Sequence, residues 1–398
     1  MKRQAAIGFI FVTLLIDVIG WGLIIPVMPQ LIAGMKHIPV NQASKEGGWL
    51  LFVYAFMQFI CAPILGNLSD QYGRRPIILI SLFGIGIDYI FLSFAPSFGW
   101  LFLGRTISGI GGASFTTASA YIADISNDET RTKNFGMVGA AFGLGFIIGP
   151  AIGGLLSGWG LRAPFYAAAI LTLANWLYGY FVLPESLAVE NHRKFSWRRA
   201  NPFSSLAQLK KYPAVIGLIL ALTLDYLGSH AIQSNWSYFT AYRFHWTPKT
   251  IGISLAVVGI LVSFVQAVLI RFSTKILGNK GSICIGLLLN ALGMLLFAIA
   301  TQSWMMFVIL LPYCLGGIAA PALQSTISGS VPANEQGELQ GSLTSLMSVT
   351  SIIGPLLMTN LFAYFTSNNA PFLFPGASFL LGGLLMLGAS LVAYKSLK

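Results

Sequence analysis

Charged residues are scarce in this chain. Asp, Glu, Lys and Arg make up 9% of the 398 residues, against about 25% in ordinary soluble domains, and this scarcity excludes a soluble enzyme. The three cysteines, Cys61, Cys284 and Cys314, show neither the pattern of a disulfide framework nor the spacing of metal ligands. The sequence contains no nucleotide-binding fingerprint and no nucleophile–base arrangement. We therefore expect no metal, no cofactor and no catalytic activity.

Apolar residues dominate instead, at 56% of the chain, with 29 phenylalanines and 43 glycines. A helix that crosses a bilayer needs about 20 mostly apolar residues. Twelve stretches meet this requirement, at residues 6–33, 48–69, 77–95, 99–122, 135–158, 164–183, 213–238, 250–270, 282–301, 304–330, 339–364 and 372–394. The expected fold class is an all-α integral membrane protein with twelve transmembrane helices.

The placement of the basic residues predicts the orientation of these spans. If the loops alternate between the two sides, 17 Lys and Arg fall on one side and five on the other, and Arg105 lies inside a span. Short cytoplasmic loops carry the basic excess, so both termini are expected in the cytoplasm and the protein in the inner (plasma) membrane. The apolar run after Lys2 and Arg3 is too long for a cleaved signal peptide and is expected to stay as the first helix. The net charge of +11 thus indicates topology and not nucleic-acid binding.

The two halves of the sequence echo each other. Ile147–Pro150 (IIGP) recurs 205 residues later at Ile352–Pro355, and Asp17–Gly20 (DVIG) is echoed 208 residues later by Asp225–Gly228 (DYLG). Repeated halves are typical of transporters. We predict a first six-helix bundle at residues 1–184, a cytoplasmic linker at 185–212 and a second six-helix bundle at 213–398, related by pseudo-symmetry.

Four charged residues lie where charge is costly. Asp17, Asp88 and Asp225 fall near the middle of their expected spans and Arg105 falls about 9 Å inside its own. A carboxylate at the centre of a bilayer costs about 2.5–3.5 kcal/mol, so such residues usually line a pathway or pair with another group. One interpretation is that the acids bind and release protons during transport. The other is that they are static acids, neutral or paired with arginine, that hold helices together.

Two glycine-containing motifs stand out. The loop Gly66–Pro76 contains Asp70, Gly73, Arg74 and Arg75, which suit a tight reversal anchored by cations at the membrane surface. In the fifth span, Gly145, Gly149 and Gly153 share one helix face beside Pro150 and Gly154. That spacing lets two helices approach closely.

Together these segments resemble the major facilitator superfamily, specifically its twelve-span drug/proton antiporter branch and, within that branch, the tetracycline efflux antiporters. The resemblance covers nearly the whole chain. It rests on the first-helix run Asp17–Pro29, the loop Gly66–Pro76, the fourth-span run Gly104–Ile110, the fifth-span run Gly145–Gly154, and, in the second half, Pro321–Gln324, Leu339–Gly341 and Ile353–Pro355.

The resemblance implies a role for each matching residue. Asp17 and Asp88 would be the intramembrane acids of the first half and Arg105 the basic residue tied to proton handling. The expected gating residues are Gly66, Asp70, Gly73, Arg74, Arg75, Asp124, Arg131, Gly145, Gly149, Pro150, Gly153 and Gly154. Two positions depart from the tetracycline antiporters: Val262 stands where they have a histidine and Asn290 where they have an aspartate. Proton coupling here would rest on Asp17, Asp88 and Asp225, and the departures argue against tetracycline itself as the substrate.

A pathway for an amphiphilic solute needs apolar and aromatic walls with a few polar groups. The resemblance places Gln58, Gln266 and Gln324 at the central cavity, and the remaining candidates for substrate binding are Trp21, Tyr54, Gln233, Asn235, Trp236 and Asn290. The alternative for the aromatic residues is packing against other helices or lipid. His230, in the same span as Asp225, is either a titrating group or a packing residue near the end of that span.

The expected function is export of a small amphiphilic organic compound or drug in exchange for protons, by alternating access. The expected partners are this substrate, protons and membrane lipid, with the monomer as the functional unit. A proton-coupled importer on the same fold is the first alternative, because fold does not set direction. A membrane receptor without transport is the second.

Overall fold

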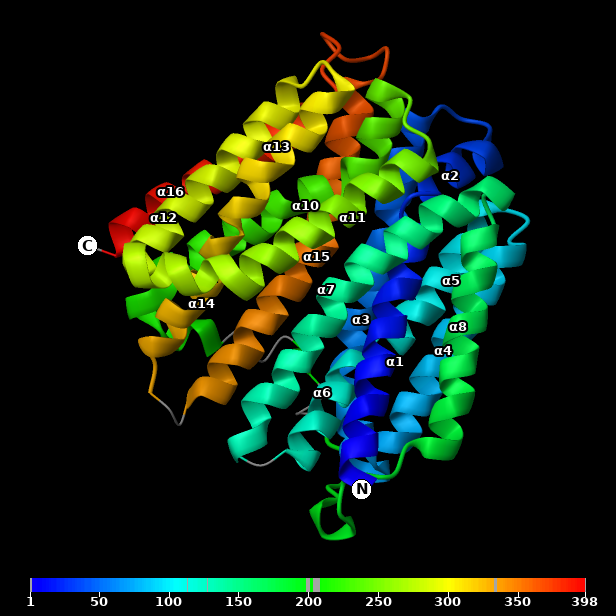
Figure 1. The fold of residues 1–398 in the computed structure, drawn as a ribbon, viewed down its shortest axis with the longest axis vertical. Coiled ribbons are helices and arrows are strands. Elements are labelled where there is room, and N and C mark those ends of the chain that lie inside the picture. The colour runs from blue at the N-terminus through cyan, green and yellow to red at the C-terminus, as the bar shows by residue number, and fades with distance from the viewer. Residues whose placement is uncertain are drawn as a thin grey trace. The chain divides into compact units, whose positions relative to one another are not determined.

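The computed structural model describes residues 2–112, 114–126, 128–197, 201–202, 208–332 and 335–397. Helices account for nearly all of this part of the chain (Figure 1). The first half contains α1 (Lys2–Ile24), α2 (Met28–Lys36), α3 (Val40–Tyr72), α4 (Arg74–Phe94), α5 (Phe98–Gly111), α6 (Ser114–Ile125), α7 (Asp128–Leu156), η1 (Ser157–Trp159), α8 (Ala163–Val182) and η2 (Val189–Asn191).

The second half repeats this pattern of long apolar helices. It contains η3 (Leu209–Lys211), η4 (Pro213–Val215), α10 (Ile216–Phe244), α11 (Pro248–Phe264), η5 (Val265–Leu269), α12 (Ile270–Ile299), α13 (Ser303–Leu315), η6 (Gly316–Ile318), α14 (Ala319–Gly329), α15 (Gln336–Phe365) and α16 (Ala377–Ser396). The element η5 is a π-helical turn.

The helices agree with an all-α membrane protein of twelve spans. Among the described residues, ten stretches are long and apolar enough to cross a membrane, and one of them, Pro248–Ile299, is 52 residues long. A single crossing needs about 20 residues, so this stretch accounts for two spans, and Gly278 breaks its helical backbone. Together α5 and α6 supply the remaining crossing, because each is too short alone.

Some expected boundaries were wrong. The first span was expected to run unbroken over residues 6–33, but α1 ends at Ile24 and α2 begins at Met28. Pro26 and Pro29 explain the break, because proline cannot donate the backbone hydrogen bond that continues a helix. The second span begins earlier than expected, at Val40.

The fourth and tenth spans are interrupted at equivalent places. In the fourth span α5 ends at Gly111 and is followed by Gly112, and in the tenth span α13 is followed by η6, which begins with Gly316 and Gly317. The second pair lies 205 residues after the first, the spacing of the IIGP repeat. Both breaks therefore belong to the repeated unit.

Two compact units make up the chain. The first comprises residues 1–36, 53–202 and 247–256, and the second comprises 37–52, 203–246 and 257–398. Each unit thus takes the start of one long helix from the other half of the sequence: α11 contributes to the first unit and α3 to the second. The boundaries expected from the repeat remain a prediction.

Glycines on α7 bring its backbone against α1 in the first unit. A Cβ atom at Gly145 would lie 2.6 Å from the side chain of Val18, and one at Gly149 would lie 2.7 Å from the carbonyl oxygen of Ile19. Gly153 meets the backbone of Leu23 in the same way. Residues four apart share a helix face, so this stripe lets the two helices touch along about two turns.

The adjacent glycine makes a second crossing within the first unit. A Cβ at Gly154 would lie 2.8 Å from the carbonyl oxygen of Pro248 and 3.2 Å from Cα of Gly252, so α7 and the start of α11 meet backbone to backbone. The second unit contains an equivalent crossing, where Gly48 on α3 faces the side chain of Thr359 on α15. Thr359 lies 205 residues after Gly154, and Gly252 lies 204 after Gly48.

Charged residues that flank α8 cap its neighbour α4 at both ends. Arg162, directly before α8, donates hydrogen bonds of 3.1 and 2.7 Å to the carbonyl oxygens of Ser93 and Ala95 at the end of α4. Glu185, shortly after α8, accepts from the first backbone amides of α4. The cation Arg162 thus lies at the C-terminus of α4 and the carboxylate of Glu185 at its N-terminus. Each charge is opposite to the partial charge of that helix end.

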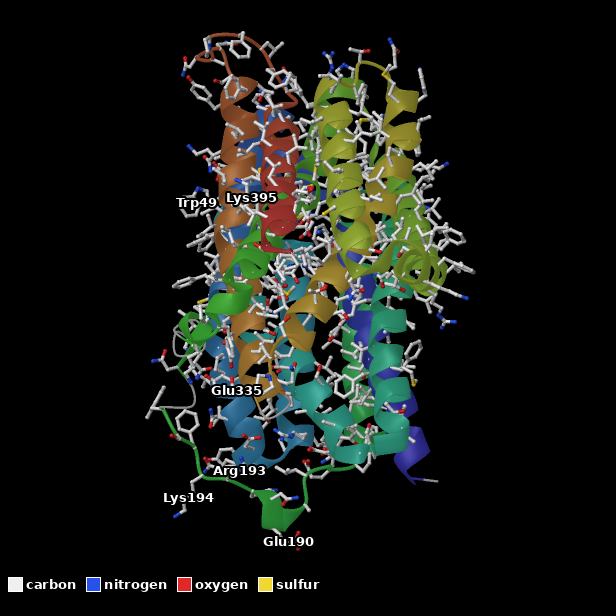
Figure 2. The ribbon with its side chains drawn as sticks, turned by 90° about the vertical axis from the view of Figure 1, so that its left-hand side faces the viewer. Trp49, Glu190, Arg193, Lys194, Glu335 and Lys395 are labelled. Atoms are coloured by element: carbon white, nitrogen blue, oxygen red, sulfur yellow. The ribbon has the colours of Figure 1, made fainter. Side chains whose placement is uncertain are left out.

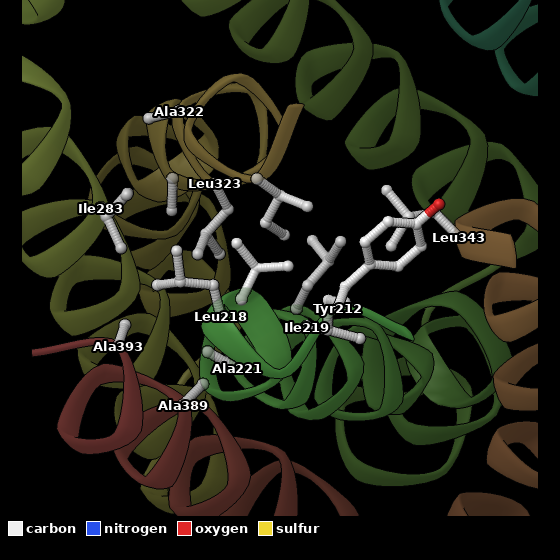
Figure 3. Close-up of a cluster of buried hydrophobic side chains, with 14 of the residues drawn as sticks. Tyr212, Leu218, Ile219, Ala221, Ile283, Ala322, Leu323, Leu343, Ala389 and Ala393 are labelled. Atoms are coloured by element: carbon white, nitrogen blue, oxygen red, sulfur yellow. The ribbon is translucent and has the colours of Figure 1, made fainter. Parts of the chain in front are cut away.

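A buried apolar cluster organises the second unit. Leu218, Ile219 and Leu222 of α10 pack with residues of α12, α14, α15 and α16, including Ile283, Leu323, Leu343 and Ala389 (Figure 3). Tyr212, at the end of the linker, also belongs to this cluster. The residues directly before α10, including Leu209 and Tyr212, are thereby packed against this helix.

The crossing at Gly252 gives a first prediction. Gly252→Ala places a Cβ against the carbonyl oxygen of Pro150 and the backbone of Gly154, so we expect a loss of about 1–3 kcal/mol from overpacking. The matched control is Gly139→Ala on α7, where a Cβ meets nothing within 4 Å and alanine favours the helix by about 0.5–1 kcal/mol. Thermal unfolding in detergent micelles measures both. A Gly252→Ala protein that melts at or above the Gly139→Ala protein would show that the helices do not meet closely at this point.

Candidate functional site

An ion pair lies buried in the first unit. Asp88 of α4 and Arg105 of α5 form a salt bridge with side chains 0% and 5% exposed. Gly104 makes room for it, because a Cβ there would collide with Oδ1 of Asp88. The charge of this acid is therefore compensated inside the bundle.

Aromatic rings surround this pair. The guanidinium carbon of Arg105 lies 6.0 Å from the ring centre of Tyr54 and 5.8 Å from that of Tyr89. Tyr89 in turn faces α1, where a Cβ at Gly20 would lie 2.8 Å from its hydroxyl. Asp17 precedes Gly20 by three residues and therefore shares its helix face. The three charged candidates of the first half thus lie around one pair of tyrosines.

Three expected substrate-binding residues lie in the same unit. The rings of Trp21 and Tyr54 are 6.4 Å apart, and Trp21 also packs edge-on against Phe146 at 6.1 Å. The amide of Gln58 donates a 3.1 Å hydrogen bond to the carbonyl oxygen of Gly112, at the break between α5 and α6. These residues, together with the ion pair, form one continuous polar and aromatic cluster.

A second polar cluster lies in the second unit. Asp225 of α10 lies beside the side chain of Asn290 of α12, and both residues are at least nine-tenths buried. The amide of Gln324 donates a 3.0 Å hydrogen bond to the hydroxyl of Tyr226, the residue directly after Asp225. Three predicted residues, from α10, α12 and α14, therefore lie close together within the first half of α10.

The other candidates of the seventh and eighth spans are dispersed. Gln233 is exposed, Asn235 is fully buried, and Trp236 is buried with its ring 5.2 Å from that of Phe297. Gln266 is exposed in the π-helical turn η5. This contact of Trp236 agrees with the alternative in which aromatic residues of the spans pack against other helices. Whether these side chains are buried depends on neighbours from other helices, so their burial could not be predicted from the sequence of one span.

The side chain of His230 on α10 packs against the second copy of the IIGP motif, on α15. Gly354 of α15 leaves space for its imidazole, which a Cβ at that position would overlap. The equivalent glycine of the first half, Gly149, faces Gly22 of α1. His230 lies 208 residues after Gly22, at the equivalent place in the repeat. The glycine of the IIGP motif therefore contacts backbone atoms in the first half and an imidazole in the second half.

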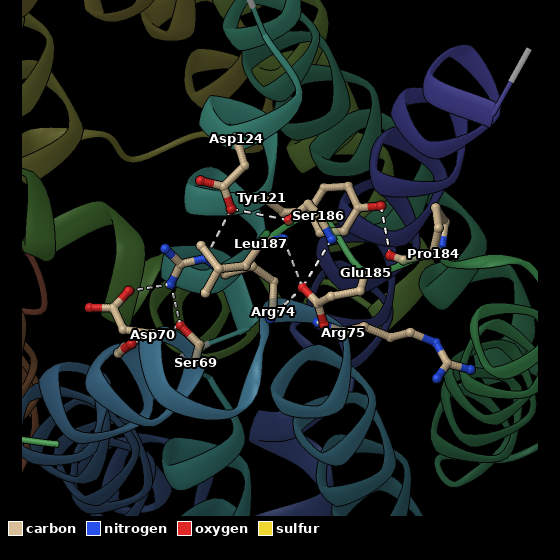
Figure 4. A network of polar contacts seen from close by, with 11 residues as sticks. Ser69, Asp70, Arg74, Arg75, Tyr121, Asp124, Pro184, Glu185, Ser186 and Leu187 are labelled. Atoms are coloured by element: carbon tan, nitrogen blue, oxygen red, sulfur yellow. Dashed lines mark hydrogen bonds and ion pairs between the residues drawn. The ribbon is translucent and has the colours of Figure 1, made fainter. Parts of the chain in front are cut away.

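The loop between α3 and α4 is built around Arg74 (Figure 4). Its guanidinium donates hydrogen bonds of 2.6 Å to Oδ1 of Asp70, 2.6 Å to Oγ of Ser69 and 3.1 Å to Oδ2 of Asp124. Gly73 adopts a positive φ of 98°, which side chains other than hydrogen disfavour. The loop thus joins α3, α4 and α6 through one cation.

Glu185 is a central member of this network that the sequence motifs did not indicate. Its Oε1 accepts from the backbone amides of Arg74 (2.8 Å), Ser186 (2.9 Å) and Leu187 (3.0 Å), and its Oε2 accepts from Arg75 (3.0 Å). In the sequence, Glu185 comes shortly after the apolar span α8. An acidic residue in such a place is a candidate cap for the N-terminus of a neighbouring helix, because that end carries a partial positive charge.

The following segment continues along the same surface. The amide of Arg193 donates to the carbonyl oxygen of Asp70 at 2.9 Å, and that of Phe195 to the side chain of Gln71 at 3.0 Å. Figure 2 shows Glu190, Arg193 and Lys194 together on this segment of the linker. The start of the linker is therefore attached to the end of α3.

The side chain of Arg131, an expected gating residue, lies outside the described residues, and a Cβ at Gly66 would meet nothing within 4 Å. In the part of the chain that the structure describes, no group of three His, Cys, Asp or Glu side chains could hold a metal ion.

Repeated long apolar helices and polar clusters buried within them define a multi-pass membrane protein of the transporter type. The chain belongs to the Major Facilitator Superfamily, whose family model matches residues 10–234 and 218–395. It is 42% identical over 363 residues to the tetracycline resistance protein, class C, of Escherichia coli, covering 91% of both chains. It is 30% identical to multidrug resistance protein 2 of Bacillus subtilis, covering 95% of this chain and 94% of the relative.

The fold is also that of solved transporters. The crystal structure of a mutant of the nucleoside transporter NupG matches with a TM-score of 0.77 at 13% identity and covers 100% of both chains. The expected membership of the superfamily and the resemblance to tetracycline antiporters are thus confirmed.

The Glu185 cap gives a second prediction. Glu185→Gln removes the negative charge from the N-terminus of α4 and weakens four hydrogen bonds, so we expect a loss of about 1–2 kcal/mol. Glu190→Gln is the matched control, because this exposed linker glutamate is expected to change stability by less than about 0.5 kcal/mol. Thermal unfolding of the two purified variants distinguishes them. Equal melting temperatures would mean that the carboxylate contributes nothing to the cap.

Proposed function

We propose that this protein is a proton-coupled exporter of a small amphiphilic organic compound or drug that works by alternating access. The buried Asp88–Arg105 pair is the observation that carries the proposal, because intramembrane ion pairs are costly and usually serve transport. The relatives named for resistance to tetracycline and to several drugs support export of such compounds.

Proton coupling follows from the chemistry of the first unit. Asp17 or Asp88 takes up a proton from outside, and Arg105 compensates the charge when Asp88 gives a proton up. Each charge moved down the membrane potential supplies about 2.3 kcal/mol per 100 mV. One or two protons per cycle are therefore enough to drive a substantial gradient of an uncharged or singly charged compound.

In this proposal, polar and aromatic residues bind the substrate. Trp21, Tyr54 and Gln58 lie beside the ion pair in the first unit, and Gln324 and Asn290 lie beside Asp225 in the second. Their mixture of flat apolar surface and single hydrogen-bonding groups suits an amphiphilic molecule. Gln233, Asn235, Trp236 and Gln266 complete the proposed set.

The loop network and the glycine crossings serve as gates. Arg74, held by Asp70 and Asp124, and the cap at Glu185 fasten the α3–α4 loop, while Gly154 permits the close crossing with α11. Alternating access requires both sets of contacts to break and re-form.

The distribution of basic residues supports an inner (plasma) membrane protein with both termini in the cytoplasm. We propose a functional monomer in contact with lipid, which acts as a transporter and not as an enzyme and binds no nucleic acid.

The ion pair gives the third prediction. In proteoliposomes, Asp17→Asn and Asp88→Asn are expected to lower proton-driven export about tenfold or more, because each removes a charge from the coupling site. Glu190→Gln, in the exposed linker, is the control. Dyes, antibiotics including tetracycline, and other amphiphilic compounds serve as probes, with flux measured in both directions. Full proton-driven transport by both asparagine variants would overturn the proposal, and net proton-driven uptake would reverse its direction.

A double variant separates transport from folding. Asp88→Asn alone leaves the arginine charge buried without a partner, which costs about 3–5 kcal/mol. The variant Asp88→Asn/Arg105→Gln removes both charges, so its melting temperature is expected to recover while its transport does not. Recovery of both properties together would show that the pair only stabilises the fold.

A further inference from the structure

An apolar groove runs along one face of α15 in the second unit. It has a volume of about 590 Å³ and lies between that face and Phe52 of α3. The residues of this face recur at intervals of three or four, so they form one stripe along the helix. The stripe consists of Ile353, Leu357, Asn360 and Tyr364. Apart from the one asparagine, the groove is therefore walled by aliphatic and aromatic side chains.

Hydrogen bonds hold the two helices beside the groove together. Nδ2 of Asn41 donates a 2.8 Å hydrogen bond to the carbonyl oxygen of Thr366. Oγ of Ser44 donates one of 3.3 Å to the carbonyl oxygen of Thr359, and Gly48 meets the side chain of the same threonine. Because these contacts fix the start of α3 against the end of α15, the walls of the groove are set before any ligand binds, as is usual for ligand sites.

The face of α3 that carries Phe52 changes in character along its length. Lys45, Trp49 and Phe52 are four and three residues apart and therefore share this face. Lys45 is exposed and lies just before the apolar part of α3. The exposed ring of Trp49 packs edge-on against Phe52 at 5.4 Å. Glu46 points to another side of the helix, because successive residues are about 100° apart.

This order of side chains matches the depth profile of a bilayer. Lysine carries its charge to the headgroups, tryptophan and tyrosine prefer the membrane–water interface, and aliphatic residues lie in the hydrocarbon. Figure 2 shows Trp49 at the edge of the molecule, and Tyr364 is exposed near the end of α15 that contacts the start of α3. The end of the groove near Lys45 and Tyr364 therefore belongs at the membrane surface, and the end near Ile353 belongs in the apolar interior.

The length of the groove suits one extended hydrocarbon chain. From Ile353 to Tyr364 the groove follows α15 for about 17 Å at the rise of an α-helix. One leaflet contributes about 15 Å to the hydrocarbon core of a bilayer. A chain that lies in the groove thus reaches from the membrane surface to about the middle of the bilayer.

Two other occupants fit the groove less well. Helices that dock in membranes pack through small residues, whereas this stripe presents bulky side chains such as Leu357 and Tyr364. A drug-like compound needs a few hydrogen-bonding groups in its site, and the amide of Asn360 already donates a 2.7 Å hydrogen bond to the carbonyl oxygen of Leu356. A flexible acyl chain requires neither small residues nor hydrogen bonds.

We propose that this groove binds one phospholipid, with an acyl chain along the stripe of α15 and the phosphate group beside Lys45. The positive charge of the lysine favours an anionic headgroup, such as that of phosphatidylglycerol, over a zwitterionic one. The bound lipid covers the surface beside the contact of α3 with α15 and thereby reinforces that contact. Lipid binding at this site depends neither on the transported compound nor on proton coupling.

Native mass spectrometry of the protein released from nanodiscs tests the groove. The nanodiscs contain phosphatidylglycerol and phosphatidylcholine in equal amounts, and the number of lipids retained per protein is counted. Leu357→Trp places a bulky ring in the groove and is expected to retain one lipid fewer than the unaltered protein. The matched control is Leu391→Trp on the exposed surface of α16, which is expected to retain the full number. Equal lipid counts in the two variants would overturn the proposal.

Substitution of Lys45 tests the position of the headgroup. Lys45→Gln removes one cation at the membrane surface, so the preference of the most tightly retained lipid for phosphatidylglycerol is expected to fall about fivefold. Lys45→Arg, which keeps the charge, is expected to keep the preference, as is the control Lys249→Gln at another exposed lysine. An unchanged preference in Lys45→Gln would contradict the contact with the phosphate and overturn the site as proposed.

A photoreactive lipid locates the chain in the unaltered protein. Phosphatidylglycerol with a diazirine in one acyl chain is cross-linked in the nanodiscs, and the labelled peptides are identified. Excess labelling is expected on α15 between Ile353 and Tyr364, relative to exposed residues of α16 such as Leu391. Equal labelling of the two surfaces would indicate contact with bulk lipid only and would overturn the proposal even if the tryptophan variant does not fold. Release of the unaltered protein as a dimer, with Leu357→Trp as a monomer, would assign the groove to a second copy of the chain instead.

Discussion

The cost of charge in apolar surroundings determines how this protein is built. A carboxylate or guanidinium taken out of water needs a partner, and the structure supplies one by bringing helices together. Asp88 and Arg105 come from different helices and become tolerable only in contact. The loop around Arg74 and the caps of α4 by Glu185 and Arg162 follow the same rule at helix ends. Charged groups thus fix the ends and the interior of the first unit, while apolar packing fills the rest.

Besides partners for its charged groups, the fold requires close approach of helix backbones, and glycine contacts provide it. Without water to drive association, helices in membranes pack through small residues. The contacts of α7 with α1 and with α11 both rely on glycines whose Cβ positions are occupied by neighbouring atoms. The crossing of α3 with α15 through Gly48 and Thr359 has the same place in the repeat. One packing solution therefore appears twice, with small differences in the residues that carry it.

Much of the fold could be predicted from the sequence, because span length and hydropathy are local properties. The spans, the repeat and the close approach at Gly145, Gly149 and Gly153 were accessible in this way. The interruptions at Gly112 and Gly316 were not, since glycine is common in membrane helices and marks a break only in a particular packing. The role of Glu185 could not be predicted, because two of its partners are the first backbone amides of α4, more than a hundred residues earlier in the chain. The fully buried Asn235 and the packed Trp236 likewise depend on contacts between helices.

The repeat makes the differences between the halves informative. The halves share the acid of their first helix, the IIGP motif and the glycine break, all of which serve packing or a common place in the bundle. They differ at the ion pair, where Asp88 and Arg105 have the counterparts Gly293 and Leu310, and at the contact where Gly22 has the counterpart His230. The divergence lies at charged and titratable groups: the first half buries an acid paired with arginine, whereas the corresponding positions of the second half are apolar.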